Sequence, residues 1–298
     1  VVMFEAFHTA GGVLMYGIPE FRLPKKLVQK ELKNVIGLGV KLQTNTIIGR
    51  TISINDLFDQ GFQAIYVSTG AGLPSFLGIP GENLNGVYSA NEFLTRMNLM
   101  KAYKFPEYDT PVHVGEKVCI VGGGNVAMDA ARSSKRLGAD VTIVYRRSFD
   151  QMPARIEESN HAKEEGINFL NLHNPVEIHG QDGWVKDVKL EKMDLGKPDK
   201  SGRARPIPTG EYETIEFDSV IVSIGQSPNP LIKQTNPEIE TEPWGGIIIN
   251  EDTTMTTKDG VFAGGDAVSG AATVILAMGA GKKAAKNIDK YIKEKRNK

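Results

Sequence analysis

The sequence has a single cysteine and no recognisable metal-ligand spacing, and these absences exclude several kinds of redox site. With Cys119 alone, the chain cannot form an intrachain disulfide, a C-x-x-C redox pair or a four-cysteine iron–sulfur site. Cys119 lies within an apolar segment, and we interpret it as a small buried hydrophobic residue. The five histidines show no H-E-x-x-H or similar spacing, so we expect no metal site.

The sequence also lacks a strong net charge and a long apolar run. Its formal net charge is −1, with 35 basic and 36 acidic residues among 298. This balance gives no support for nucleic-acid binding or for electrostatic attachment to a membrane. No window approaches the length of a transmembrane helix, and the first residues lack the flanks of a signal peptide. We therefore expect a cytoplasmic protein that is long enough for two domains.

What the sequence does contain is a glycine-rich turn between an apolar strand and a helix. Residues 117–147 read KVCIVGGGNVAMDAARSSKRLGADVTIVYRR, which predicts a strand, a turn, a helix and a second strand. The turn follows the pattern Gly122-x-Gly124-x-x-Ala127. The first glycine permits a tight turn, and the second lets the backbone approach a pyrophosphate. Because the start of a helix attracts phosphates, this segment predicts a dinucleotide site.

The second strand of this segment ends at Arg146 and Arg147. A site specific for NAD would carry an acid there, which binds the ribose 2′-hydroxyl. Two guanidinium groups favour a 2′-phosphate instead, because arginine matches phosphate geometry bidentately. The sequence therefore predicts NADP(H), and a solvated surface charge is the alternative for either arginine alone.

The opening residues predict a strand that is already under way, which ends at Glu5 and is followed by Gly11 and Gly12. In a nucleotide-binding βαβ unit, an acid at the end of the second strand binds a ribose hydroxyl, and the glycine loop lies upstream. We therefore expect the chain to start inside a Rossmann-like unit whose first strand, phosphate loop and first helix precede Val1. An ordinary acid at a strand end is the alternative for Glu5.

Apolar periodicity and turn residues predict the remaining elements. The similar strand ends at 64–70 and 218–225 indicate two stacked nucleotide folds. Residues 194–208 are predicted to form a polar loop, with their basic run at a solvated hairpin tip. Asp266 follows a strand and precedes an apolar helix that starts near Ala272, where it either binds a polyol hydroxyl or caps a turn. The other predicted helices are 25–38, 54–60, 89–100 and 154–165, and the other predicted strands are 40–48, 167–172, 176–179 and 185–193.

Four stretches of the sequence carry a family resemblance. They are GGVLMYGIPEFRLPK, GLPSFLGIPGENLNGVYSANEFL, VGGGNVAMDAARSSKRLGADVTIVYRR and GVFAGGDAVSGAATVILAMGAGKKAA. In this order they resemble the small (beta) subunit of NADPH-dependent glutamate synthase and related NADPH:FAD oxidoreductases. The resemblance implies an α/β fold with two Rossmann-like domains of the glutathione-reductase type. It places the FAD domain at 1–79 and 232–298, and an inserted NADPH domain with its crossover at 80–231.

The resemblance also implies the cofactors NADPH and FAD and the residues that hold them. For NADPH these are Gly122, Gly124, Asn125 and Val126 at the pyrophosphate, Arg146 and Arg147 at the 2′-phosphate, and Gly225 beside the nicotinamide half. For FAD they are Glu5 at the adenosine ribose, Gly11, Gly12 and Leu14 along the cofactor, Thr69 and Gly70 in a turn packed against it, Asp266 at a ribityl or pyrophosphate-side hydroxyl, and Ala272 and Thr273 at the flavin pyrimidine edge. No catalytic acid or base is expected, because the cofactors carry the chemistry.

The activity implied by the resemblance is hydride transfer from NADPH to FAD, with electrons passed on to the large subunit of glutamate synthase. That enzyme forms glutamate from glutamine and 2-oxoglutarate. The same core in a ferredoxin:NADP transhydrogenase or a sulfide dehydrogenase is one alternative, and a module that only binds NADP(H) is another. Iron–sulfur clusters would lie on a missing region or on the partner. Without its phosphate loop we expect the chain to bind FAD weakly or not at all, and an open sheet edge would favour a homo-oligomer.

Overall fold

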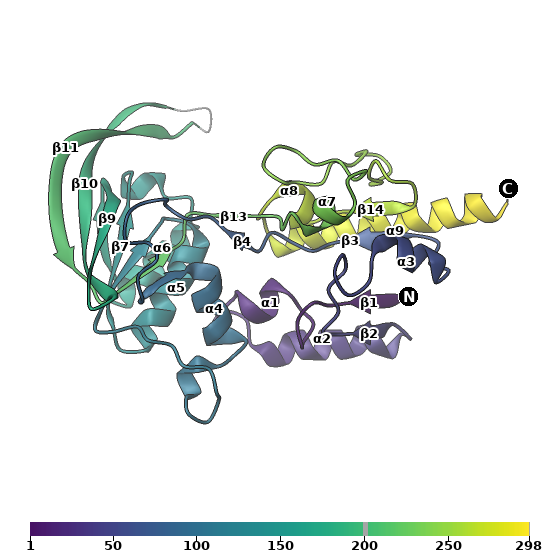
Figure 1. The fold of residues 1–298 in the computed structure, drawn as a ribbon, viewed down its shortest axis with the longest axis horizontal. Coiled ribbons are helices and arrows are strands. Elements are labelled where there is room, and N and C mark those ends of the chain that lie inside the picture. The colour runs from purple at the N-terminus through teal and green to yellow at the C-terminus, as the bar shows by residue number, and fades with distance from the viewer. Residues whose placement is uncertain (199–201, 298) are drawn as a thin grey trace. The chain divides into compact units, whose positions relative to one another are not determined.

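The protein, seen in a computed structural model that describes residues 1–198 and 202–297, folds into two compact units (Figure 1). Unit 1 is made of Val1–Gly12, Gln29–Leu73 and Gln226–Lys298, and unit 2 of Val13–Val28 and Pro74–Gly225. The boundaries expected from the sequence, after residues 79 and 231, lie slightly beyond these. Val13–Val28 also differs from the expectation, because it packs in unit 2.

A five-stranded parallel sheet with the order β5-β12-β6-β7-β8 lies at the centre of unit 2. Both faces of a parallel sheet are usually covered, so its strands read as continuous apolar runs. The sequence KVCIV of β6 has this character, and four of its five residues are buried. The strands are β5 (Val87–Ser89), β6 (Lys117–Val121), β7 (Asp140–Tyr145), β8 (Asn168–Asn171) and β12 (Ser219–Val222).

Two different layers cover the faces of this sheet, because successive side chains of a strand point to opposite faces. Val118 and Ile120 of β6 pack in a core with helices α4 and α5, whereas Cys119 and Val121 pack against β9 and β10. The expected burial of Cys119 is confirmed, and burial raises the pKa of its thiol. The covering elements are α4 (Ala90–Asn98), α5 (Asn125–Arg136), α6 (Ile156–Glu164), β9 (His173–Gln181), β10 (Trp184–Pro198) and β11 (Ala204–Glu216).

The prediction of a polar loop at 194–208 is wrong for most of its length. β10 continues to Pro198 and β11 begins at Ala204, and the two form the long antiparallel hairpin seen in Figure 1. Residues 199–201, which belong to the predicted basic tip, lie outside the described residues. Most residues of β11 are exposed. Only a few of its side chains, such as that of Ile215, pack partly against the core, so the sequence carries little hydrophobic periodicity that would reveal it.

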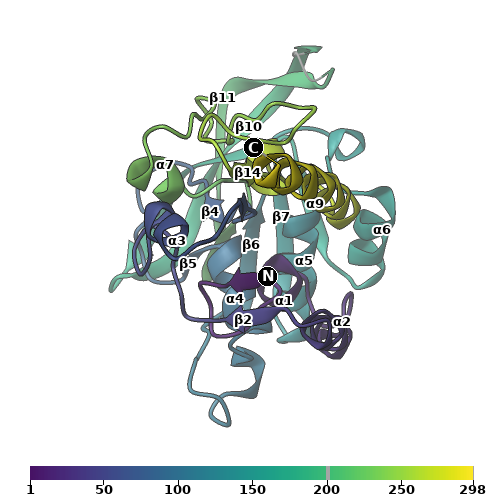
Figure 2. The same cartoon turned by 90° about the vertical axis from the view of Figure 1, so that its right-hand side faces the viewer.

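Unit 1 contains two short parallel pairs, β1 with β2 and β3 with β14 (Figure 1). Its long helix α9 is also labelled in Figure 2. The core of unit 1 includes Ile54, Val67, Ile239 and Val261. The predicted strand 40–48 is confined to β2, and none of the described helices is both long and apolar enough to cross a membrane. The elements are β1 (Val2–Phe4), β2 (Lys41–Gln43), β3 (Ile65–Val67), β14 (Val261–Ala263), α2 (Lys25–Gly37), α3 (Ile54–Asp59), α7 (Leu231–Thr235), α8 (Asp266–Ser269) and α9 (Val274–Arg296).

The segment Val13–Val28, which we call the strap, is held in unit 2 by polar contacts. It contains the short helix α1 (Val13–Tyr16), whose following turn is bound by a side chain from α4. The amide nitrogen of Asn98 donates to the carbonyl oxygens of Tyr16 and Gly17, at 3.2 and 3.1 Å. Hydrophobic periodicity does not reveal such contacts, because a hydrogen bond from a side-chain amide to a distant backbone carbonyl has no signature in the sequence.

Arg22 is the main charged anchor of the strap. Its Nη1 lies 2.7 Å from both carboxylate oxygens of Asp129, and its Nη2 lies 3.0 Å from Oε1 of Glu158. Arg132 reaches the other oxygen of Glu158 at 2.9 Å. Burial raises the pKa of Asp129 to about 6, although the charge of Arg22 opposes this rise. We call these four residues the Arg22 network.

Replacing Arg22 with alanine should destabilise the protein by about 3 kcal/mol, because the buried carboxylate of Asp129 loses its bonded partner and Glu158 keeps only Arg132. The matched control is Arg96→Ala, which removes the exposed ion pair with Glu92 and should cost about 0.5 kcal/mol. Chemical denaturation of both variants measures the difference. Equal losses in the two variants would show that the Arg22 network does not hold the strap.

Candidate nucleotide-binding sites

Gly122 makes the tight turn that follows β6. Its φ is +135°, and a Cβ atom at this position would lie 2.2 Å from the carbonyl oxygen of Ser223. Ser223 follows β12, and its backbone nitrogen donates to the carbonyl of Val121 at 2.8 Å. Any side chain at position 122 would therefore force these two strand ends apart.

Gly124 stands in contrast, because no atom lies within 4 Å of the place where its Cβ would be. It is the N-cap of α5, with extended backbone angles and no side-chain capping bond. The first N–H groups of a helix have no partner within the helix. The open space at Gly124 and the N–H groups of Asn125 and Val126 therefore leave room for an anionic group, and the positive end of the helix dipole favours it.

The NADPH residues expected from the sequence lie at one edge of the sheet, near the carboxyl ends of three neighbouring strands. β6 lies between β7 and β12, and the chain proceeds from β6 to β7 on one side and reaches β12 on the other. Ligands of open parallel sheets bind in the crevice at such a switch point. Gly122 ends β6, Arg146 follows β7, and Gly225 comes shortly after β12, with a φ of +118°.

The two arginines after β7 have different environments. Arg147 is only 5% exposed, and its Nε donates to the carbonyl oxygen of Ala204 in β11 at 2.7 Å. Arg146 is exposed, and within the described part of the chain its side chain has no hydrogen-bond or ion-pair partner. Of the two, Arg146 is therefore the guanidinium that a ligand can reach without disturbing the fold.

The chain after β7 returns to the glycine turn, which the sequence did not reveal. The hydroxyl of Tyr145 donates to the carbonyl of Gln151 at 3.0 Å. The backbone nitrogens of Ala154 and Arg155 then donate to the carbonyl of Gly123 and to Oδ1 of Asn125, at 3.0 and 2.9 Å. The sequence predicts a helix from residue 154, but α6 begins at Ile156 with Arg155 as its N-cap. The backbone nitrogens of residues 154 and 155 therefore lie before the helix and bind the glycine turn.

The residues expected around the adenosine end of FAD are divided between the units. Glu5 follows β1, and its Oε1 accepts a hydrogen bond from the backbone nitrogen of Phe7 at 2.9 Å. Gly11 and Gly12 also lie in unit 1, with φ values of +129° and +52°. Leu14 belongs to the strap in unit 2, where its carbonyl accepts a bond from Lys25 at 2.9 Å.

Thr69 and Gly70 follow β3 at the carboxyl edge of its pair with β14. Gly70 has a φ of +72° and open space where a Cβ would lie. Thr69 lines a cavity of about 220 Å³ that lies entirely within unit 1. The other lining residues are Pro228, Asn229, Pro230, Ile232, Lys233, Thr241, Glu242, Pro243, Gly245 and Ile247.

Asp266 begins α8, and Ala272 and Thr273 come directly before α9. Oδ1 of Asp266 accepts a hydrogen bond from the backbone nitrogen of Ala272 at 3.3 Å, and partial burial raises the pKa of this carboxyl. Thr273 caps α9 by accepting from the nitrogen of Leu276 at 3.4 Å. Asp266 therefore does cap a turn, and its second carboxylate oxygen remains for a further donor.

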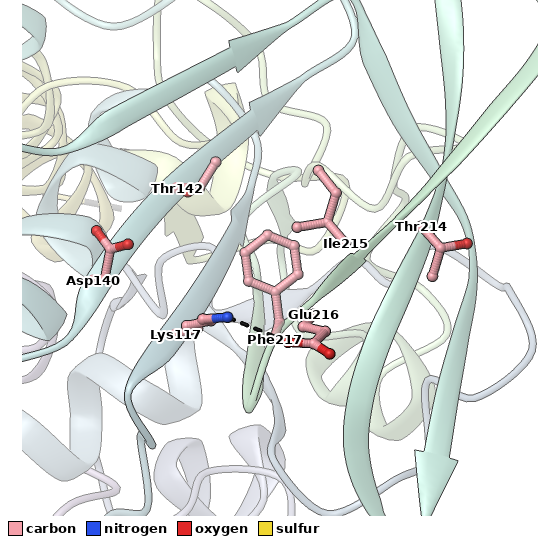
Figure 3. A pocket seen from close by; sticks show the side chains of 7 residues that line it. All are labelled: Lys117, Asp140, Thr142, Thr214, Ile215, Glu216 and Phe217. Carbon is pink, nitrogen blue, oxygen red and sulfur yellow. Dashed lines mark hydrogen bonds and ion pairs between the residues drawn. The ribbon is translucent and has the colours of Figure 1, made fainter.

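A separate cavity of about 350 Å³ in unit 2 lies at the opposite end of the central sheet (Figure 3). Lys117 and Asp140 start β6 and β7, and Lys117 pairs with Glu216 at 3.3 Å. Because nucleotides bind at the carboxyl ends of parallel strands, we assign no cofactor to this cavity. The described residues also hold no cluster of histidine, cysteine or acidic side chains arranged for a metal. The cavity is lined by Lys117, Asp140, Thr142, Thr214, Ile215, Glu216 and Phe217.

Comparison with curated proteins confirms the resemblance found in the sequence. The glutamate synthase [NADPH] small chain of Escherichia coli (strain K12) is 33% identical over 301 residues, which is 98% of this chain and 63% of that protein. The NADP(+)-dependent formate dehydrogenase subunit beta of Moorella thermoacetica is 37% identical over 298 residues, which is 99% of this chain and 41% of that protein. The chain thus spans less than two thirds of these relatives.

Solved structures confirm the expected α/β fold. FprA from Mycobacterium tuberculosis in complex with NADPH has a TM-score of 0.80 at 21% identity, covering 99% of this chain and 78% of that one. Thioredoxin reductase from Lactococcus lactis has a TM-score of 0.73 at 23% identity, covering 98% and 91%. A family model described as pyridine nucleotide-disulphide oxidoreductase matches residues 8–282. The chain therefore belongs to the pyridine nucleotide-disulphide oxidoreductase family, whose members include NADPH-dependent enzymes.

Proposed function

We propose that this chain is the NADPH- and FAD-binding core of an electron-input subunit of the glutamate synthase type. The observation that carries this proposal is the glycine turn of unit 2. It combines an open Gly124, an uncapped start of α5 and an exposed Arg146 at one sheet edge. This arrangement suits a dinucleotide with a 2′-phosphate.

On this proposal, unit 2 holds NADPH. Gly124, Asn125 and Val126 offer backbone N–H groups to the pyrophosphate, and Gly225 leaves space beside the nicotinamide half. Arg146 binds the 2′-phosphate. Arg147 supports the same region through the fold, since its guanidinium joins the end of β7 to β11.

Unit 1 supplies the residues expected for FAD, except Leu14, which lies in unit 2. Glu5 binds the adenosine ribose, and Asp266 offers its second carboxylate oxygen to a hydroxyl of the cofactor. Open glycines at positions 12 and 70 allow close approach of the backbone, and the uncharged start of α9 favours electron-rich oxygen atoms. When bound, the two cofactors supply hydride transfer from nicotinamide to flavin, and the protein supplies placement and electrostatics.

Two kinds of partner are candidates for the electron acceptor. Glutamate formation with a large partner subunit is the first candidate, because the motifs and several relatives are those of glutamate synthase small chains. A partner that oxidises or forms formate is the second candidate, because a formate dehydrogenase beta subunit is 37% identical. Reconstitution with each candidate partner, followed by assay of glutamate or formate turnover, separates the two.

The first experiment is an absorbance spectrum of the protein with and without added FAD, followed by parallel titration with NADPH and NADH. Any flavin that binds should be bleached by NADPH at concentrations at least about tenfold below those of NADH, because arginine favours the 2′-phosphate. Equal responses to the two nucleotides would contradict the proposed NADPH specificity. Selective NADPH binding without flavin would leave only a nucleotide-binding module.

Gly124→Ala should separate nucleotide binding from folding. The added methyl meets no protein atom, but alanine is a poorer N-cap than glycine, so stability should fall by no more than about 1 kcal/mol. The methyl occupies the space through which the backbone approaches the pyrophosphate, so affinity for NADPH and NADH should both fall at least about tenfold. The matched control is Gly37→Ala, at an equally open glycine in α2. Calorimetric titration and thermal unfolding measure both effects, and unchanged affinity would contradict the assignment.

Arg146→Gln should weaken NADPH binding alone. A charge-assisted hydrogen bond contributes about 1.5–3 kcal/mol, which corresponds to a loss of about tenfold or more for NADPH. NADH lacks the 2′-phosphate, so its affinity should stay the same. The control is Arg50→Gln, which removes an equally exposed arginine in unit 1. A parallel loss for both nucleotides would place Arg146 elsewhere in the site.

A further inference from the structure

The segment that returns from β7 brings the N-terminus of α6 against the N-terminus of α5. The backbone nitrogen of Arg155 donates to Oδ1 of Asn125 at 2.9 Å, and Asn125 is the first residue of α5. One residue earlier, the nitrogen of Ala154 donates to the carbonyl of Gly123 at 3.0 Å. Two successive bonds therefore fix the backbone of Arg155 beside the glycine turn.

The packing of Gly123 reinforces this placement. A Cβ atom at Gly123 would lie 2.8 Å from ring atoms of Tyr145 and 3.2 Å from Cγ of Met152. The ring of Tyr145 and the segment that leads to Arg155 therefore press directly on the turn. Little freedom remains for the backbone of Arg155 to move away from it.

The side chain of Arg155 is exposed and, unlike its backbone, forms none of the hydrogen bonds or ion pairs seen among the described residues. The carboxylate of Glu158, one turn into α6, is already bound by Arg22 and Arg132. A cation at the N-terminus of a helix opposes the helix dipole, so this position does not stabilise α6.

We propose that Arg155 binds the pyrophosphate of the dinucleotide. This inference rests on the proposed function, and it adds a charged group to a turn that otherwise offers only backbone N–H groups. A guanidinium can bind two phosphate oxygens at once. The pyrophosphate is common to NADPH and NADH, so Arg155 contributes to the affinity of both. Arg146, by contrast, distinguishes between them.

The test compares Arg155→Gln with Arg146→Gln by calorimetric titration with NADPH and with NADH. Arg155→Gln should lower the affinity for both nucleotides about tenfold and leave their ratio unchanged. Arg155→Lys, which retains the charge but not the planar fork, should recover part of the loss. The control is Lys186→Gln, which removes an exposed cation of β10 in the same unit. Thermal unfolding should be nearly unchanged in Arg155→Gln, because within the described residues the side chain has no hydrogen bond or ion pair to lose.

The outcomes distinguish this inference from the proposed function. If the unmodified protein binds the nucleotides and Arg155→Gln binds them equally well, the inference is overturned and the proposed function stands. A loss for NADPH alone would move Arg155 to the 2′-phosphate and also overturn the inference. An unmodified protein that binds neither nucleotide would overturn the proposed function, and the inference with it.

Discussion

The contact between Gly122 and Ser223 is the constraint on which the rest of unit 2 depends. A Cβ atom at position 122 would lie 2.2 Å from the carbonyl of Ser223, so the ends of β6 and β12 can approach only because it is absent. This approach keeps β6 in register with both neighbours and starts α5 directly at the sheet edge. The geometry offered to a nucleotide is thus a consequence of strand packing.

The strap adds a second constraint to the same helix. Arg22 binds Asp129, which lies on the buried side of α5 one turn beyond its start, and also Glu158 on α6. Arg132 of α5 also binds Glu158, so a shift between the two helices would break ion pairs of poorly solvated carboxylates. The two helices whose N-termini meet at the glycine turn are therefore held together by Arg132 and by Arg22 of the strap.

Much of this could be predicted from the sequence, but only where the chain follows a pattern. The glycine turn, the strands around it and the helix after it show apolar runs and turn residues, and the structure places them within a residue or two of the prediction. β11 is mostly exposed and was missed, and the contact of Arg155 with Asn125 joins residues that have no periodic relation. The strap packs in unit 2, whereas the sequence-based division put it with the first part of the FAD domain, and ion pairs such as that of Arg22 leave no signal in the sequence.

The adjacent arginines after β7 show why residue type alone does not establish specificity. Sequence reasoning treats Arg146 and Arg147 alike, since both match a 2′-phosphate. In the structure, the Nε of Arg147 is bonded to Ala204 and its side chain is buried, so a ligand would compete with a bond that holds β11 in place. The exposed side chain of Arg146 has no such bond within the described residues. The distinction between cofactors should therefore depend on the one arginine that the fold leaves exposed, while its neighbour fixes the strand end from which that arginine projects.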